Sequence, residues 1–216
     1  MSTLVAGKVA SFFAQYPQRH YPKGQIIIFG GEDPEHIYYL ASGQVRKYDV
    51  SYRGDEVIVN IFKTGAFFPM SWAINRKPNR YFYKTEVDTE LQVAPTDEAL
   101  EFIRDNPDVM YDLLARLYRG MDGLFGRIVH LMSGTAKSRL VYELIIECRR
   151  FGVPQADGSI LLTANEQDLA ARSGLSRETI SREMSKLKND GLVAIGAAGI
   201  TIANLEHLEA TLGNAV

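Results

Sequence analysis

The chain has 216 residues, 46% hydrophobic and 23% charged, which is ordinary for a globular protein and ample for a hydrophobic core. Its 24 Lys and Arg against 26 Asp and Glu give a formal charge of −2, which excludes a uniformly basic coat but not a local basic patch. No apolar run approaches the roughly 20 residues of a membrane helix, and the first ten residues lack the pattern of a secretory signal. We therefore expect a cytoplasmic protein without membrane contact.

Cysteine and histidine usage limits metal chemistry. Cys148 is the single cysteine, so the chain cannot form an internal disulfide, a four-cysteine zinc site or a cysteine-ligated iron–sulfur cluster. The four histidines, His20, His36, His130 and His207, show no metal-binding spacing. We expect no catalytic residue and no metal ligand. The alternative from another class is a cupin-type metalloenzyme, although it lacks paired histidines.

Residues 19–95 read as short strands separated by turns, without helices between them. The strands are rich in β-branched and aromatic residues and cover 36–40, 45–50, 56–62 and 81–87. Closely spaced strands of this kind indicate an antiparallel sandwich or barrel, which can enclose one ligand.

The aromatic residues are distributed unevenly. Of the 22 aromatics, 20 lie before residue 135, and only Tyr142 and Phe151 follow. This change predicts two domains with different roles and a boundary near residues 133–135.

A heptad pattern begins after Pro107. Its apolar residues recur at alternating spacings of 4 and 3, which predicts a long helix with a coiled-coil seam. The alternative is one amphipathic helix packed on its own domain. The seam consists of Met110, Leu114, Leu117, Met121, Leu124, Ile128 and Leu131.

A second amphipathic helix follows Gly134, with Val141, Leu144, Ile145 and Cys148 on one face. Cys148 is therefore expected in the core rather than as a reactive thiol. Asp157 and Gly158 read as a hairpin turn.

Residues 163–193 carry the most specific pattern. Residues 163–166 read as a capping box that begins a short helix at Thr163. Gly174 suits the tight turn between two helices, and Ser176 begins the second helix. We expect Ile180, Met184 and Leu187 on its buried side. This arrangement is a helix-turn-helix, followed by two strands of a wing at 192–195 and 199–202.

The outward side chains of the second helix suit DNA. Arg177 and Arg182 can pair with guanine, and Glu178 can accept from cytosine. Arg172, Lys186 and Lys188 are placed to neutralise phosphates. The alternative is a helical hairpin with a solvated charged face. The expected DNA-binding residues are Thr163, Arg172, Ser176, Arg177, Glu178, Ser181, Arg182, Lys186 and Lys188.

The sequence at 175–193 resembles the recognition helix and wing entry of the Crp/Fnr transcription regulators, and 21–24, 38–45 and Gly65 resemble their β-roll. The resemblance implies an α+β fold: an antiparallel β-roll (double-stranded β-helix) sensor over 1–106, a dimerisation helix and hinge over 107–134, and a winged helix-turn-helix over 135–216. It also implies a homodimer on a two-fold symmetric site of TGTGA or, through Ser181, TTGAT type, with RNA polymerase as a partner.

The ligand stretch departs from the cyclic-AMP pattern of that family. Pro69 stands where a ribose-binding Glu is expected, Asn79 where a phosphate-binding Arg is expected, and Arg80 where a hydroxyl is expected. A cyclic nucleotide is disfavoured, and no cofactor is assigned. A heme-based gas sensor using His20, His36 or His130 is a further alternative.

An apolar or aromatic effector is the favoured ligand; a packed core without a ligand is the alternative. The expected pocket residues are Phe67, Phe68, Pro69, Met70, Ser71, Trp72, Arg80, Tyr81 and Tyr83, with Leu124 and Phe125 on the seam helix. We expect an effector to shift the arrangement of the two domains about a Ser133–Gly134 hinge.

Overall fold

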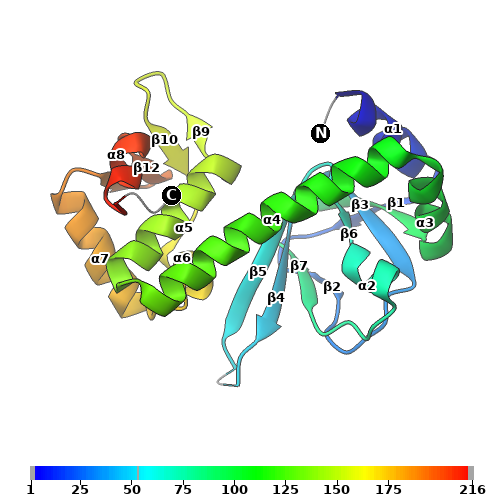
Figure 1. The fold of residues 1–216 in the computed structure, drawn as a ribbon, viewed down its shortest axis with the longest axis horizontal. Coiled ribbons are helices and arrows are strands. Elements are labelled where there is room, and N and C mark those ends of the chain that lie inside the picture. The colour runs from blue at the N-terminus through cyan, green and yellow to red at the C-terminus, as the bar shows by residue number, and fades with distance from the viewer. Residues whose placement is uncertain (1–2, 53, 214–216) are drawn as a thin grey trace. The chain divides into compact units, whose positions relative to one another are not determined.

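The computed structural model describes residues 3–52 and 54–213 (Figure 1). The chain divides into two compact units, residues 1–118 and 119–216, and the division falls inside one long helix. The domain limits and the hinge expected from the sequence stay predictions. None of the helices in the described residues is long and apolar enough to cross a membrane.

The first unit contains two four-stranded antiparallel sheets, which confirms the antiparallel β-roll. One sheet has the order β1-β8-β3-β6 and the other β2-β7-β4-β5. Their strands are β1 (Gln18–Tyr21), β2 (Ile26–Ile28), β3 (His36–Ser42), β4 (Gln44–Val50), β5 (Glu56–Lys63), β6 (Phe67–Phe68), β7 (Phe82–Thr85) and β8 (Thr89–Pro95).

Both sheets contribute side chains to one core. Leu40, Phe68 and Leu91 come from the first sheet, and Val45 and Tyr83 from the second. The rings of Phe68 and Tyr83 stack with centroids 5.3 Å apart. Aromatic and β-branched residues fill this interior because alternate residues of each strand face inward.

The opposite face of the first sheet is covered by helices. A second core joins Ile37 and Phe67 of the sheet to Val9, Ile103 and Val109 of the helices. The helices of this unit are α1 (Thr3–Phe13), α2 (Met70–Asn75), α3 (Thr96–Asp105) and the first part of α4 (Pro107–Ser133).

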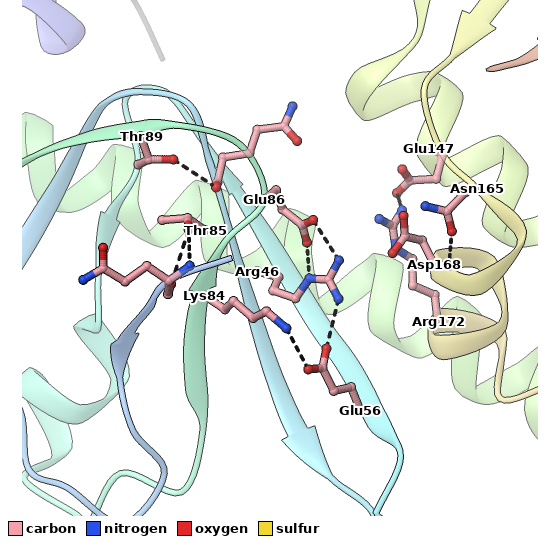
Figure 2. A network of polar contacts seen from close by, with 12 residues as sticks. Arg46, Glu56, Lys84, Thr85, Glu86, Thr89, Glu147, Asn165, Asp168 and Arg172 are labelled. Atoms are coloured by element: carbon pink, nitrogen blue, oxygen red, sulfur yellow. Dashed lines mark hydrogen bonds and ion pairs between the residues drawn. The ribbon is translucent and has the colours of Figure 1, made fainter. Parts of the chain in front are cut away.

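An ion-pair network lies on the outer surface of the second sheet (Figure 2). Arg46 donates to both carboxylate oxygens of Glu86 and, at 3.0 Å, to Glu56, which also accepts from Lys84 at 3.0 Å. These ion pairs connect β4, β5 and the end of β7 on the outer face of the sheet. Aromatic side chains lie on its inner face.

The second unit combines helices with a small antiparallel sheet of order β11-β12-β10-β9. Its remaining elements are α5 (Ala136–Phe151), β9 (Val153–Pro154), β10 (Ile160–Leu162), α6 (Glu166–Ser173), α7 (Arg177–Asn189), β11 (Val193–Gly196), β12 (Gly199–Ile202) and α8 (Leu205–Ala210). Cys148 is 6% exposed in the core of this unit, which confirms the expectation of a buried thiol.

The end of α4 is attached to α5 within the second unit. Arg127 forms a bidentate ion pair with Glu143, and Arg139 donates to the carbonyls of His130 and Leu131 at the end of α4. These contacts span the expected Ser133–Gly134 hinge. The last turns of α4 and the start of α5 therefore form one packed piece.

Candidate DNA-binding surface and effector site

The turn between α6 and α7 is built as the sequence predicts. Gly174 has a φ of +65°, in the left-handed region that favours glycine. Ser176 caps α7 by accepting from the backbone N–H of Thr179 at 3.2 Å. Leu175 lies between them and contacts the core of the unit. The turn thus fixes where α7 begins.

The buried side of α7 orients the helix. Ile180, Met184 and Leu187 are fully buried against the core, as expected from their spacing. Because these three residues occupy one face, the residues on the opposite face of the helix must point outward.

The outward face of α7 carries the side chains that the sequence predicts to contact DNA. Its members are all exposed: Arg177, Glu178, Ser181, Arg182, Ser185, Lys186 and Lys188. Hydrogen bonding from its own backbone N–H and then from Ser176 lowers the pKa of the Glu178 carboxyl, so Glu178 stays an acceptor.

Glu183 is a further residue of this surface that the sequence reasoning missed. Its side chain is 6% exposed, and its carboxylate accepts from Lys186 at 2.8 Å and from Arg182 at 3.5 Å. The hydrogen bond from Lys186 is the main reason why its pKa is lowered. The i, i+3 spacing of Glu183 and Lys186 was the available signal. Glu183 positions two of the cations that α7 presents.

Two expectations for the first helix are wrong. The cap of α6 is Asn165, whose side chain accepts from the N–H of Asp168 at 2.9 Å, so Thr163 precedes the helix as an exposed residue. Arg172 does not face outward: its side chain is 6% exposed and is paired with Glu147 of α5 (Figure 2). Arg172 therefore joins α6 to α5 and is not available for a phosphate.

The expected effector pocket is not assembled as one site. Phe67 and Phe68 are neighbours in β6 and point to opposite faces of the sheet, because successive strand residues alternate. Phe68 lies in the core between the sheets, whereas Phe67 packs with Met70 and Trp72 in the core under the helices. The ring of Phe67 also contacts Arg116 of α4, whose guanidinium carbon is 5.3 Å from the ring centroid.

The residues around α2 are engaged elsewhere. Trp72 donates to Asp33 at 3.1 Å and lines a surface hollow of about 440 Å³ with Arg76 and Asp97. Pro69 immediately precedes α2, and Ser71 is exposed. This hollow opens on the surface and not into the core between the sheets.

The polar side chains of the loop before β7 form hydrogen bonds and an ion pair with other residues of the first unit. Asn79 is 5% exposed and donates to the carbonyls of Phe29 and Tyr81, at 3.1 and 2.8 Å. Arg80 pairs with Asp49. Tyr81 belongs to the partly buried rim of the core between the sheets. Leu124 and Phe125 are exposed residues of α4 in the other compact unit.

Comparison with known proteins gives two family matches in chain order. Residues 18–106 match the cyclic nucleotide-binding domain, and residues 138–211 match the Crp-like helix-turn-helix domain. The chain belongs to the Crp/Fnr family. It is therefore a Crp/Fnr-type DNA-binding transcription regulator.

Curated relatives extend over most of this Crp/Fnr chain. The global nitrogen regulator of Nostoc is 29% identical over 185 residues, covering 84% of this chain and 83% of that protein. The cyclic AMP receptor protein of Thermus thermophilus is 27% identical over 194 residues, covering 90% and 87%.

Solved structures share the fold. The c-di-GMP responsive global regulator CLP of Xanthomonas campestris has a TM-score of 0.78 at 21% identity, covering 91% of this chain and 98% of that one. A CooA mutant from Carboxydothermus hydrogenoformans has a TM-score of 0.79 at 19% identity, covering 94% and 90%.

The two alternatives from the sequence gain no structural support. Within residues 3–52 and 54–213, no three His, Cys, Asp or Glu side chains gather as a metal site of the cupin kind. His20 is tied to Glu90 at 2.8 Å, and His130 packs on the Tyr142 ring with centroids 4.6 Å apart. His20 is an exposed residue of β1, and His130 lies in the second compact unit.

Proposed function

We propose that this regulator binds a two-fold symmetric DNA site as a homodimer. The observation that carries the proposal is the exposed polar face of α7 opposite its buried face. A recognition helix presented in this way fits the major groove, and two copies would lie one DNA turn, roughly 34 Å, apart.

The proposed contacts divide by chemistry. Arg177, Glu178, Ser181 and Arg182 read base edges, because forked donors and carboxylates match guanine and cytosine edges. The phosphate contacts come from Lys186 and Lys188, with Thr163 before α6 and Ser176 at the start of α7. The half-site is of TGTGA or TTGAT type.

The proposed dimer forms along α4. Six of the seven seam residues are 40–57% exposed in the single chain, although all are apolar, and Met121 is half-buried. A regular apolar seam left open in this way favours a partner helix over packing on its own unit. RNA polymerase is the further partner proposed at a promoter, with an effector other than cyclic AMP controlling the regulator.

Selection of bound fragments from a random DNA pool tests this function. The wild-type chain should enrich a two-fold symmetric sequence, and Arg177→Ala should lose about 1–3 kcal/mol of discrimination at one base of each half-site. Equal losses on selected and random DNA for Arg177→Ala would contradict its role. Sedimentation should give a dimer for the wild type and a monomer for Leu117→Asp.

A further inference from the structure

The surface hollow beside α2 is built from three separate segments of the first unit. The loop before β3, helix α2 and the junction of β8 with α3 each supply part of its wall. Thr96 of the junction donates its hydroxyl to the carbonyl of Glu35 in the loop at 2.9 Å, and Trp72 of α2 donates to Asp33 of the same loop at 3.1 Å. These bonds hold the three segments together, so the hollow of about 440 Å³ is a preformed concavity of the size of a ligand site.

The hollow carries an excess of negative charge. It is lined by the carboxylates of Asp33, Glu35 and Asp97 and by one cation, Arg76, which gives a net charge of −2. Over residues 3–52 and 54–213, the carboxylate of Glu35 makes no hydrogen bond or ion pair. Asp33 accepts from the neutral indole N–H of Trp72, which leaves its charge uncompensated. A concave surface with such an excess of carboxylates attracts cations.

A guanidinium of the chain itself occupies part of the hollow. The guanidinium carbon of Arg76 lies 5.3 Å from the centroid of the Trp72 ring, and its Nη2 donates to Asp97 at 2.7 Å. The side chains of Arg76 and Asp97 are 51% and 89% exposed, so their ion pair contributes little and is readily exchanged. An aromatic ring beside a carboxylate suits a planar guanidinium, which stacks and donates at the same time. Arg76 thus shows which chemical group this wall of the hollow accepts.

We propose that this hollow binds a small organic dication that carries a guanidinium at one end. The guanidinium of the ligand replaces that of Arg76 against Trp72 and Asp97. The second cationic group of the ligand meets the uncompensated carboxylates of Asp33 and Glu35. The site goes beyond the proposed function, because neither α7 nor the seam of α4 contributes a residue to the hollow.

Trp72 allows a direct measurement, because it is the only tryptophan in the chain. Agmatine, which joins a guanidinium to an ammonium through a short alkyl chain, should change the fluorescence of Trp72 in the full chain along a saturable curve. The titration is made at constant ionic strength, so that general screening does not contribute. 4-Guanidinobutyrate has a carboxylate in place of the ammonium, and putrescine has ammonium groups at both ends. Both should bind roughly 3–10-fold more weakly than agmatine, since each lacks one of the two matched groups.

Three variants that keep Trp72 locate the binding. Asp97→Asn should weaken agmatine binding about 2–5-fold. Asp108→Asn removes a carboxylate of the same unit outside the hollow, where it pairs with Lys8, and should leave agmatine binding unchanged. Arg76→Asn should strengthen binding about 2–5-fold, because it removes the guanidinium that competes with the ligand. Asparagine is chosen because it tolerates the left-handed φ of +51° at this position.

The proposal is overturned if agmatine leaves the fluorescence of Trp72 unchanged, or if 4-guanidinobutyrate or putrescine binds as tightly as agmatine. Equal affinity of Asp97→Asn and the wild type would overturn it as well. Weaker binding by Arg76→Asn would show that Arg76 holds the ligand and does not compete with it, which contradicts the proposed exchange. Circular dichroism of each variant verifies that a change in affinity is not a loss of fold.

Discussion

Arg127 of α4 and Glu143 of α5 form a buried bidentate ion pair, with Nε–Oε1 and Nη2–Oε2 distances of 2.6 and 2.9 Å. Their side chains are 15% and 2% exposed. A carboxylate so deeply buried depends on its partner, because removing one charge leaves the other unpaired in a low dielectric.

Arg127→Ala should therefore destabilise the second unit by about 3–5 kcal/mol. The double variant Arg127→Met with Glu143→Leu should recover most of that loss, because it leaves no unpaired charge. Urea unfolding followed by circular dichroism measures both. A loss below about 1 kcal/mol for Arg127→Ala would show that the pair behaves as a surface salt bridge.

Two glycines of α4 should respond in opposite ways to alanine. A Cβ at Gly126 would collide with the Tyr142 ring, whereas one at Gly120 would meet nothing within 4 Å. Gly120→Ala should stabilise the chain by about 1 kcal/mol through helix propensity. Gly126→Ala should be destabilising, because overpacking costs about 1–3 kcal/mol. The gain of about 1 kcal/mol from helix propensity offsets only part of that cost. Thermal unfolding of both variants compares them, and equal stabilisation would contradict the close approach of Tyr142.

Arg172 and Lys188 should differ in how they affect DNA binding. Lys188→Ala should weaken binding on all sequences and reduce the salt slope by about 1. Arg172→Ala should leave the salt slope unchanged and lower stability, because it leaves Glu147 buried without its partner. Fluorescence anisotropy over a range of salt concentrations separates the two. A reduced salt slope for Arg172→Ala would show that Arg172 does contact a DNA phosphate.

Cys148 should resist thiol reagents in the native chain. Burial, assisted by the charges of Glu147 and Glu209, raises the pKa of its thiol to about 12, so the reactive thiolate is scarce at pH 8. Ellman's reagent should label it only in denaturant. Rapid labelling of one thiol per chain under native conditions would contradict its place in the core.

Lys47→Met should stabilise the first unit at pH 7. Burial holds the pKa of Lys47 at about 8 in the folded chain, below the ordinary lysine value of 10.5, so the unfolded chain binds more protons between these pH values. Wild-type stability should therefore gain from this group as pH rises from about 8 to 10.5, and the advantage of Lys47→Met should shrink over that range. Lys84→Met, which removes a cation paired with Glu56 on the outer face of the same sheet, is the comparison variant. Denaturant unfolding at pH 7, 9 and 10.5 measures it.

The helix-turn-helix formed by α6 and α7 was predictable because its sequence signals are local. Gly174, Ser176 and the spacing of Ile180, Met184 and Leu187 define a turn, a cap and a buried face within fifteen residues. Their geometry depends on hydrogen bonds and contacts between near neighbours. Sequence periodicity therefore placed α7 and its outward face correctly.

The misplaced residues depend on contacts between distant segments. Arg172 looks like a phosphate contact until Glu147, 25 positions earlier, is found beside it. Lys47 reads as an ordinary strand residue, and its position over Tyr81 follows only from the pairing of β4 with β7. The register of strands and the depth of a charge are set by tertiary packing, which no local pattern contains.

The two-residue strand β6 connects the core between the sheets to α4 within the first unit. Phe68 stacks on Tyr83 in the core between the sheets, and Phe67 lies against Arg116 of α4 on the other side. The side chain of Arg116 also donates to the carbonyl of Gly65 at 3.2 Å, just before the strand. We therefore expect a ring displaced inside the roll to move β6 and, through the contact of Phe67 with Arg116, the first half of α4, which carries Leu114 and Leu117 of the proposed dimer seam.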